Sequence, residues 1–173
     1  MSNHVHLIAV PDRPESLAVL FRRVHGRYAQ MVNARRGRSG HLWQNRYYSC
    51  ALSPGHLRRA LVYVERNPIR AGIAGRVEDY KWSSAAAHLG LARDRYGILD
   101  REFWEYCGGV AGWREIHGMA EDEAELRLLR RCTYAGRPYG EEEYVAVFEQ
   151  HFQRVWRKWG FEKETEERVT FAV

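Results

Sequence analysis

The sequence predicts an α+β fold, with strands and helices in the N-terminal part and helices alone after it. Residues 4–10 and 46–52 are typical of strands, because each is a short apolar or aromatic run bounded by turn-forming residues. Residues 15–34 and 54–67 carry apolar side chains at helical spacing, which predicts two helices, each following one strand.

The first helix is expected to carry one apolar stripe, with arginines largely off it. The stripe consists of Leu17, Leu20, Phe21, Val24, Tyr28 and Met31. The second helix begins at Ser53 and Pro54, because serine at the N-cap and proline at the first helical position are both favoured. It is expected to end near Asn67, because Pro68 disfavours a helical conformation in the residue before it.

The later part of the chain consists of shorter, acidic, helical segments separated by glycine breaks. Helices are predicted at residues 121–131 and 142–158. The change in character predicts one domain over residues 1–90 and a helical C-terminal region over residues 91–173.

The composition is that of a soluble globular protein, with 45% hydrophobic and 28% charged residues. No apolar run approaches the roughly 20 residues that a membrane span needs, so no membrane partner is expected. The N-terminus lacks the features of a secretory signal, and the three cysteines form no C-x-x-C pair. We therefore expect a cytoplasmic protein with reduced cysteines.

Positive charge is concentrated in the N-terminal half. Residues 1–80 carry 13 Arg, no Lys and 5 acidic residues, whereas residues 81–173 carry 14 basic and 17 acidic residues. Arginine suits phosphate, because its planar guanidinium can donate two parallel hydrogen bonds. An arginine-rich soluble surface is an equally valid interpretation of composition alone.

Two small patterns favour a chemical site. His4 and His6 are one residue apart on the predicted strand, so both imidazoles lie on one face, as in a two-ligand metal clamp. Tyr63 and Asn67 are four apart and share one face of the second helix with Arg59. The alternatives are histidines that merely lie at a strand end and a tyrosine that merely packs on an amphipathic helix.

Four segments, in order along the chain, carry a family resemblance. Residues 1–8 resemble the histidine strand of the HUH single-strand transposases, in particular the REP-associated tyrosine transposases. Residues 40–48 are similar to the stretch before the last strand of that family. Residues 63–72 are similar to its nucleophile helix, and residues 79–84 to the segment that follows that helix.

The resemblance implies a ferredoxin-like antiparallel sheet with helices on one side, N-terminally incomplete because strands that precede the histidines in the family are missing before Met1. It implies Tyr63 as the nucleophile and His4, His6 and Asn67 as ligands of a divalent metal, Mg²⁺ or Mn²⁺. The implied activity is a metal-dependent single-strand DNA endonuclease and strand transferase that forms a 5′-phosphotyrosine, on hairpin-forming DNA.

The expected DNA contacts follow from the basic half. Arginines would neutralise phosphates and aromatic residues would stack on bases, although Trp43 is equally suited to packing. The candidates are Arg22, Arg23, Arg27, Arg35, Arg36, Arg38, Trp43, Arg46 and Arg59. The protein would act as a monomer or homodimer.

Two other interpretations remain open. The chain could be a non-catalytic nucleic-acid-binding remnant of such a transposase, with salt-dependent binding and no cleavage. The C-terminal helices could instead form a partner-binding or helix-turn-helix module.

Overall fold

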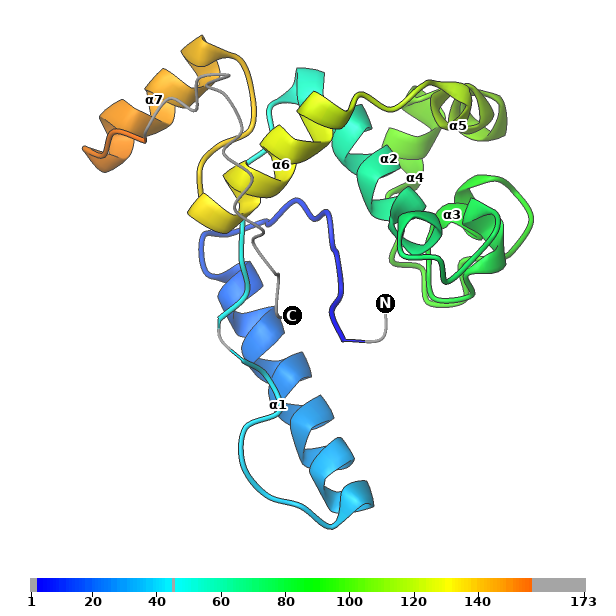
Figure 1. Ribbon diagram of the computed structural model, residues 1–173, viewed down its shortest axis with the longest axis vertical. Coiled ribbons are helices and arrows are strands. Elements are labelled where there is room, and N and C mark those ends of the chain that lie inside the picture. The colour runs from blue at the N-terminus through cyan, green and yellow to red at the C-terminus, as the bar shows by residue number, and fades with distance from the viewer. Residues whose placement is uncertain (1–2, 45, 157–173) are drawn as a thin grey trace. The chain divides into compact units, whose positions relative to one another are not determined.

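The computed structural model describes residues 3–44 and 46–156, and this part of the chain is helical (Figure 1). Seven α-helices and one short 3₁₀ helix follow one another along it. They are α1 (Ser16–Arg36), α2 (Pro54–Arg70), η1 (Val77–Asp79), α3 (Ala85–His88), α4 (Arg101–Tyr106), α5 (Gly109–Gly118), α6 (Glu123–Ala135) and α7 (Glu142–Phe152).

The predicted ferredoxin-like antiparallel sheet is wrong, because the described residues contain no strand. Residues 4–10 are extended, and residues 46–52 form only a single parallel bridge, between Leu52 and Tyr139. A strand requires a partner that satisfies its backbone N–H and C=O groups, and neither segment lies along another extended segment among the residues described. Alternating apolar residues predicted the extended conformation but could not supply that partner.

Contacts divide the chain into two compact units. One unit comprises residues 1–7 and 50–173, and the other comprises residues 8–49. The expected division between residues 1–90 and residues 91–173 rests on a change in sequence character and not on contacts. It stays a prediction.

The unit of residues 8–49 consists of α1 and the segment that returns along it (Figure 1). The Trp43 indole stacks on the His25 ring with 4.0 Å between ring centroids, and its N–H donates to the His25 carbonyl. Tyr47 packs on Phe21, with centroids 4.4 Å apart. These contacts cover part of the apolar stripe, and Leu20, Val24, Tyr28 and Met31 remain exposed.

The core of the other unit lies among α2, α3, α4 and α5, which Figure 1 shows grouped together. Buried side chains from three of these elements form it, and partly buried residues of α2 pack against them. The buried members are Leu89, Cys107, Trp113 and Ile116. Cys50, Cys107 and Cys132 are free thiols. No helix in the described part of the chain is both long and apolar enough to cross a membrane.

Helix α2 does not end near Asn67 as predicted but continues to Arg70, with Pro68 inside it. Proline removes one helical hydrogen bond, yet the last turn is still closed by bonds from Ala71 N to Asn67 O and from Gly72 N to Ile69 O. The Arg70 guanidinium also donates to the carbonyl of Tyr63, one of the residues in the preceding turns. These bonds stabilise the end of α2 around Pro68.

The two predicted C-terminal helices have shifted bounds. Helix α6 begins after Asp122, whose side chain accepts a hydrogen bond from Ala124 N, and runs to Ala135. Helix α7 ends at Phe152, because Gln153 adopts a left-handed conformation (φ 49°). Residues 157 and 158 of the predicted helix lie outside the described residues.

The start of α2 is covered by the segment between α6 and α7. Ser53 N donates to Tyr139 O at 3.0 Å, and Tyr139 N donates to Ala51 O at 2.8 Å. The Tyr144 hydroxyl donates to Leu52 O at 3.0 Å. Ser53 and Tyr139 are almost fully buried as a result. We call this contact the latch, meaning residues 51–53 with residues 139–144.

We predict that Gly140→Ala destabilises the protein by about 1–3 kcal/mol, the usual cost of overpacking a tight contact. A Cβ at Gly140 would lie 2.6 Å from Tyr144 Cδ1 and 2.8 Å from Ser53 Cβ, both closer than carbon atoms approach. Gly118→Ala, where no atom lies within 4 Å, is the matched control. Urea unfolding measures both variants, and equal midpoints would contradict the prediction.

Candidate functional site

The two histidines lie on one side of an extended segment. His4 and His6 are partly buried, whereas Asn3, Val5 and Leu7 between and beside them are exposed. The His4 and His6 ring centroids are 4.9 Å apart. The alternation expected of a strand therefore holds here even without a sheet.

Burial lowers the pKa of His6 to about 4, and the positive charges of His4 and Arg70 lower it further in the same direction. Burial also lowers the pKa of His4. Both rings are therefore neutral near pH 7, and each has a nitrogen lone pair. His4 Nδ1 lies 2.8 Å from Asn3 Oδ1, which leaves its Nε2 as the available donor atom.

Asn67 reaches the same place from α2. Its Nδ2 lies 2.7 Å from His6 Nε2. Because the nitrogen and oxygen of an amide exchange places when the group is turned over, Asn67 Oδ1 can take the same position beside His6. One turn earlier on α2, the Tyr63 ring packs edge-on against His6 with 5.6 Å between centroids. The structure thus brings together His4, His6, Tyr63 and Asn67, residues that the family resemblance implied to form one site.

The nitrogen and oxygen atoms of these side chains are of the kinds that bind a divalent cation. Two neutral imidazoles and one carboxamide could bind a metal, and they would leave positions open for other oxygen ligands. Among residues 3–44 and 46–156, no group of three or more His, Cys, Asp or Glu side chains is arranged to hold a metal. A metal in this site would therefore depend on the amide of Asn67 as its third protein ligand.

Arg70 belongs to the site, and sequence reasoning missed it. Its guanidinium carbon lies 4.5 Å from the centroid of the Tyr63 ring, and Nη1 pairs with Glu121 Oε1 at 2.5 Å. Arg70 is seven residues from Tyr63, which places the two on one face two helical turns apart. Because α2 was predicted to end near Asn67, Arg70 was not placed on the same helix face as Tyr63 from the sequence.

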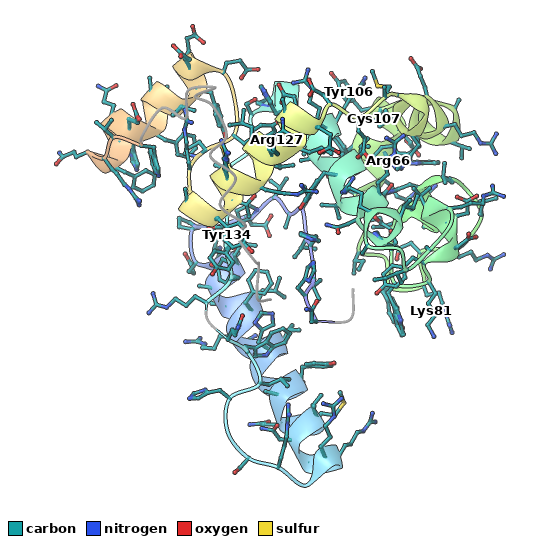
Figure 2. The ribbon with its side chains drawn as sticks, in the orientation of Figure 1. Arg66, Lys81, Tyr106, Cys107, Arg127 and Tyr134 are labelled. Carbon is teal, nitrogen blue, oxygen red and sulfur yellow. The ribbon has the colours of Figure 1, made fainter. Side chains whose placement is uncertain are left out.

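Arg130 of α6 also faces Tyr63, with its guanidinium carbon 5.7 Å from the ring centroid. Nothing in the sequence indicates this contact, because the two residues are far apart in the chain. Arg66, one turn after Tyr63 on α2, donates to the carbonyls of His117 and Met119 (Figure 2). It therefore ties α2 to the end of α5.

Glu65 lies on the opposite side of α2 and is almost fully buried, with 1% of its surface exposed. Its Oε1 accepts hydrogen bonds from Ser84 and His88, each at 2.6 Å. Its Oε2 accepts hydrogen bonds from Trp113 at 2.9 Å and His117 at 2.7 Å. Sequence reasoning missed this network too, because the spacing of the donors gives no sign that they meet.

Burial alone would raise the pKa of Glu65, but the hydrogen bonds from His117, His88, Ser84 and Trp113 outweigh it and lower the pKa to about 2. The carboxylate therefore stays ionised. It fixes the rotation of α2 against α3 and α5, which directs Tyr63 and Asn67 away from the core.

The predicted DNA-binding arginines of α1 are exposed. Three of them, Arg22, Arg23 and Arg27, line an open depression of about 500 Å³. Arg35, Arg36 and Arg38 follow at the end of the helix, and Arg38 Nε donates to Asn33 Oδ1 at 3.1 Å.

The remaining DNA-binding candidates differ in their surroundings. Trp43 and Arg46 line a second open depression, of about 590 Å³, together with His41. The Trp43 ring packs on His25 and also contacts the Tyr28 ring, with centroids 5.8 Å apart, so packing within its own unit already engages part of the indole. Arg59 pairs with Glu125 at 3.3 Å and keeps more than half of its side chain exposed.

Residues 1–67 match the family model described as "Transposase IS200 like". This region contains both histidines, Tyr63 and Asn67, so the part of the chain that carries the candidate site is similar to the IS200-like transposases. The match ends at Asn67, so residues 68–173 lie outside it. No curated protein and no solved structure matches the chain.

We predict that Glu65 contributes stability that is lost in acid. Its pKa is depressed from 4.5 to about 2 in the folded protein, so the contribution is full above about pH 5 and falls as the pH drops toward 2. A shift of this size corresponds to about 3 kcal/mol. Urea unfolding of wild type and Glu65→Gln between pH 7 and pH 3 measures it.

The difference between the two proteins should shrink as the pH falls. Glu115→Gln, which removes an exposed carboxylate from α5, should unfold like the wild type at every pH. A difference between wild type and Glu65→Gln that stays constant with pH would contradict this role of Glu65.

Proposed function

We propose that this protein is a DNA transposase that cuts single-stranded DNA through a covalent 5′-phosphotyrosine on Tyr63, and that His4, His6 and Asn67 bind the divalent metal that the reaction uses. The observation that carries the proposal is the meeting of these side chains from two distant segments. Asn67 lies 2.7 Å from His6, and the Tyr63 ring packs against the same imidazole.

The chemistry assigned to Tyr63 is an attack of its phenol oxygen on phosphorus. A bond forms between phosphorus and the tyrosine oxygen, the bond to the 3′-oxygen breaks, and the leaving oxygen takes a proton. The phenol proton leaves to solvent. Since the phosphotyrosine ester keeps the energy of the phosphodiester, another 3′-hydroxyl can attack it and rejoin strands without an external energy source.

The protein residues have separate tasks in this proposal. Helix α2 holds Tyr63 and Asn67 one turn apart, so the nucleophile and the metal ligand keep a fixed relation. The neutral imidazoles of His4 and His6 offer lone pairs at physiological pH. A bound Mg²⁺ or Mn²⁺ would act as a Lewis acid on the scissile phosphate.

The proposed substrate is single-stranded or hairpin DNA. The exposed arginines of α1 supply positive charge without sequence specificity, and the partly buried Trp43 is a candidate for stacking on a base. Such a surface is suited to unpaired strands, whose bases are free to stack.

We predict that the protein and Mn²⁺ form a covalent adduct with hairpin oligonucleotides taken from the DNA that flanks its gene. The adduct retains a label at the 3′ end of the oligonucleotide and loses one at the 5′ end, because Tyr63 keeps the 5′-phosphate. Tyr63→Phe should abolish it, since phenylalanine has no oxygen to form the ester. Denaturing gels measure the adduct.

Tyr106→Phe is the matched control, because Tyr106 is exposed on α4 (Figure 2). This variant should form as much adduct as the wild type. His6→Ala should lower adduct formation at least tenfold and should weaken Mn²⁺ binding, which electron paramagnetic resonance measures. DNA binding without any adduct in the wild type would instead favour the non-catalytic remnant.

We also predict that the arginines of α1 set the salt dependence of DNA binding. Replacing Arg22, Arg23 and Arg27 together by Gln should reduce the slope of log K against log salt by about 2, since each phosphate contact to a single strand contributes about 0.7. Fluorescence anisotropy with a labelled single strand measures the slope. Three exposed arginines of the other unit serve as the control for net charge: Arg93, Arg95 and Arg101. Equal slopes for both triple variants would show that the arginines of α1 do not set the salt dependence of DNA binding.

A further inference from the structure

We propose that Arg70 and Arg130 form a phosphate-binding pair at Tyr63, and that this pair receives the scissile phosphodiester. The inference deepens the proposed function and rests on it for the identity of the phosphate. It assigns part of the catalytic site to α6, in a segment beyond the family match.

Arg70 is held rigidly in place. One end of its guanidinium pairs with Glu121, and the other donates to the Tyr63 carbonyl. Only 16% of its side chain is exposed, and its Nε is buried without a hydrogen-bond partner in the structure. A buried, unsatisfied donor on a charged group is costly, so its presence beside the nucleophile indicates a place for an acceptor that arrives from outside.

Arg130 approaches the same ring from α6. Its guanidinium carbon is 5.7 Å from the Tyr63 centroid, and within the described part of the chain it makes no ion pair. The side chain is half-buried, so its charge is partly removed from water. An unpaired and partly desolvated guanidinium favours the binding of an anion.

The charges around Tyr63 do not balance. Arg70 and Arg130 contribute two positive charges at the Tyr63 ring, and Glu121, which pairs with Arg70 and also with Arg66 at 3.8 Å, contributes one negative charge. A purely structural cation–π contact requires only one cation on a ring. The excess positive charge matches the charge of a phosphodiester, whose oxygens a planar guanidinium can bind in pairs.

The position of the pair also suits the reaction. The two guanidinium carbons lie 4.5 Å and 5.7 Å from the centroid of the Tyr63 ring, so a phosphate that they bind would lie near the phenol. Fixed positive groups at that point would stabilise the charge that develops on the phosphoryl oxygens. Arg70 and Arg130 would then be catalytic residues that act together with the metal site.

The test uses inorganic phosphate as the probe, with the full-length protein in EDTA. Phosphate is titrated into ¹⁵N-labelled protein, and the amide signals of Tyr63, Arg70 and Arg130 are followed by NMR. In the wild type these signals should shift as phosphate is added, and the shifts should reach a plateau when the site is full. The shifts should be lost in Arg130→Gln and retained in Arg127→Gln, which removes an exposed charge one turn away on α6 (Figure 2).

Unmoved signals in the wild type would overturn the proposal. The proposal would also be overturned if the amide signals of Arg130→Gln shift as those of the wild type do, because phosphate binding would then not require both arginines. Arg130 is the decisive position, since its half-exposed side chain makes no ion pair whose loss would unfold the protein. Arg70→Lys keeps the charge but not the planar fork, and it should bind phosphate with intermediate affinity.

A second arm separates this inference from the proposed function. Under single turnover with saturating DNA, Arg130→Gln should slow adduct formation about 100-fold, and the dissociation constant for DNA should change little. Arg127→Gln should react like the wild type. If the wild type shows the phosphate shifts but forms no Tyr63 adduct, the proposed function fails and the phosphate site stands. If Arg130→Gln forms the adduct as fast as the wild type does, the role of Arg130 fails and the proposed function stands.

Discussion

The buried carboxylate of Glu65 is the interaction on which the rest of the structure depends. It accepts four hydrogen bonds from side chains that follow α2, at Ser84, His88, Trp113 and His117, and so joins α2 to α3 and α5. An ionised carboxylate in a protein interior is stable only when its oxygens are fully hydrogen-bonded, so the network permits little variation in how these elements meet. The rotation of α2 is set by this one residue.

That rotation determines what the other side of α2 can do. Tyr63 and Asn67 stand two residues before and after Glu65, and thus roughly opposite to it, where they meet His6 from the N-terminal segment. Arg70 extends the same face by one more turn. A single helix therefore has one side fixed by a buried charge, and its other side carries Tyr63, Asn67 and Arg70. The family match covers the first two of these residues but not the third.

The sequence predicted the residues of this site better than the fold around them. Helical spacing paired Tyr63 with Asn67 and the His-x-His pattern paired His4 with His6, because each of these relations is local in the chain. Only the family resemblance implied that the two pairs meet in one site, as they do in the structure. The sheet was wrong because strand pairing depends on distant partners, which the residues around His6 or Tyr48 cannot reveal. Arg130 was missed for the same reason, and Arg70 because Pro68 was expected to stop a helix that other bonds sustain. Whether the site binds metal and cuts DNA is a separate question of chemistry.

The latch at the start of α2 has a consequence for how the chain folds during synthesis. Cys50 donates to the Arg137 carbonyl across 87 residues of sequence, and Tyr139 covers Ser53 from a similar separation. The ribosome delivers residues 50–53 long before it releases their partners. Loop closure over such a span is slow compared with local helix formation. The first turn of α2 must therefore remain uncovered until residues 137–144 have emerged, so its native contacts form late in folding.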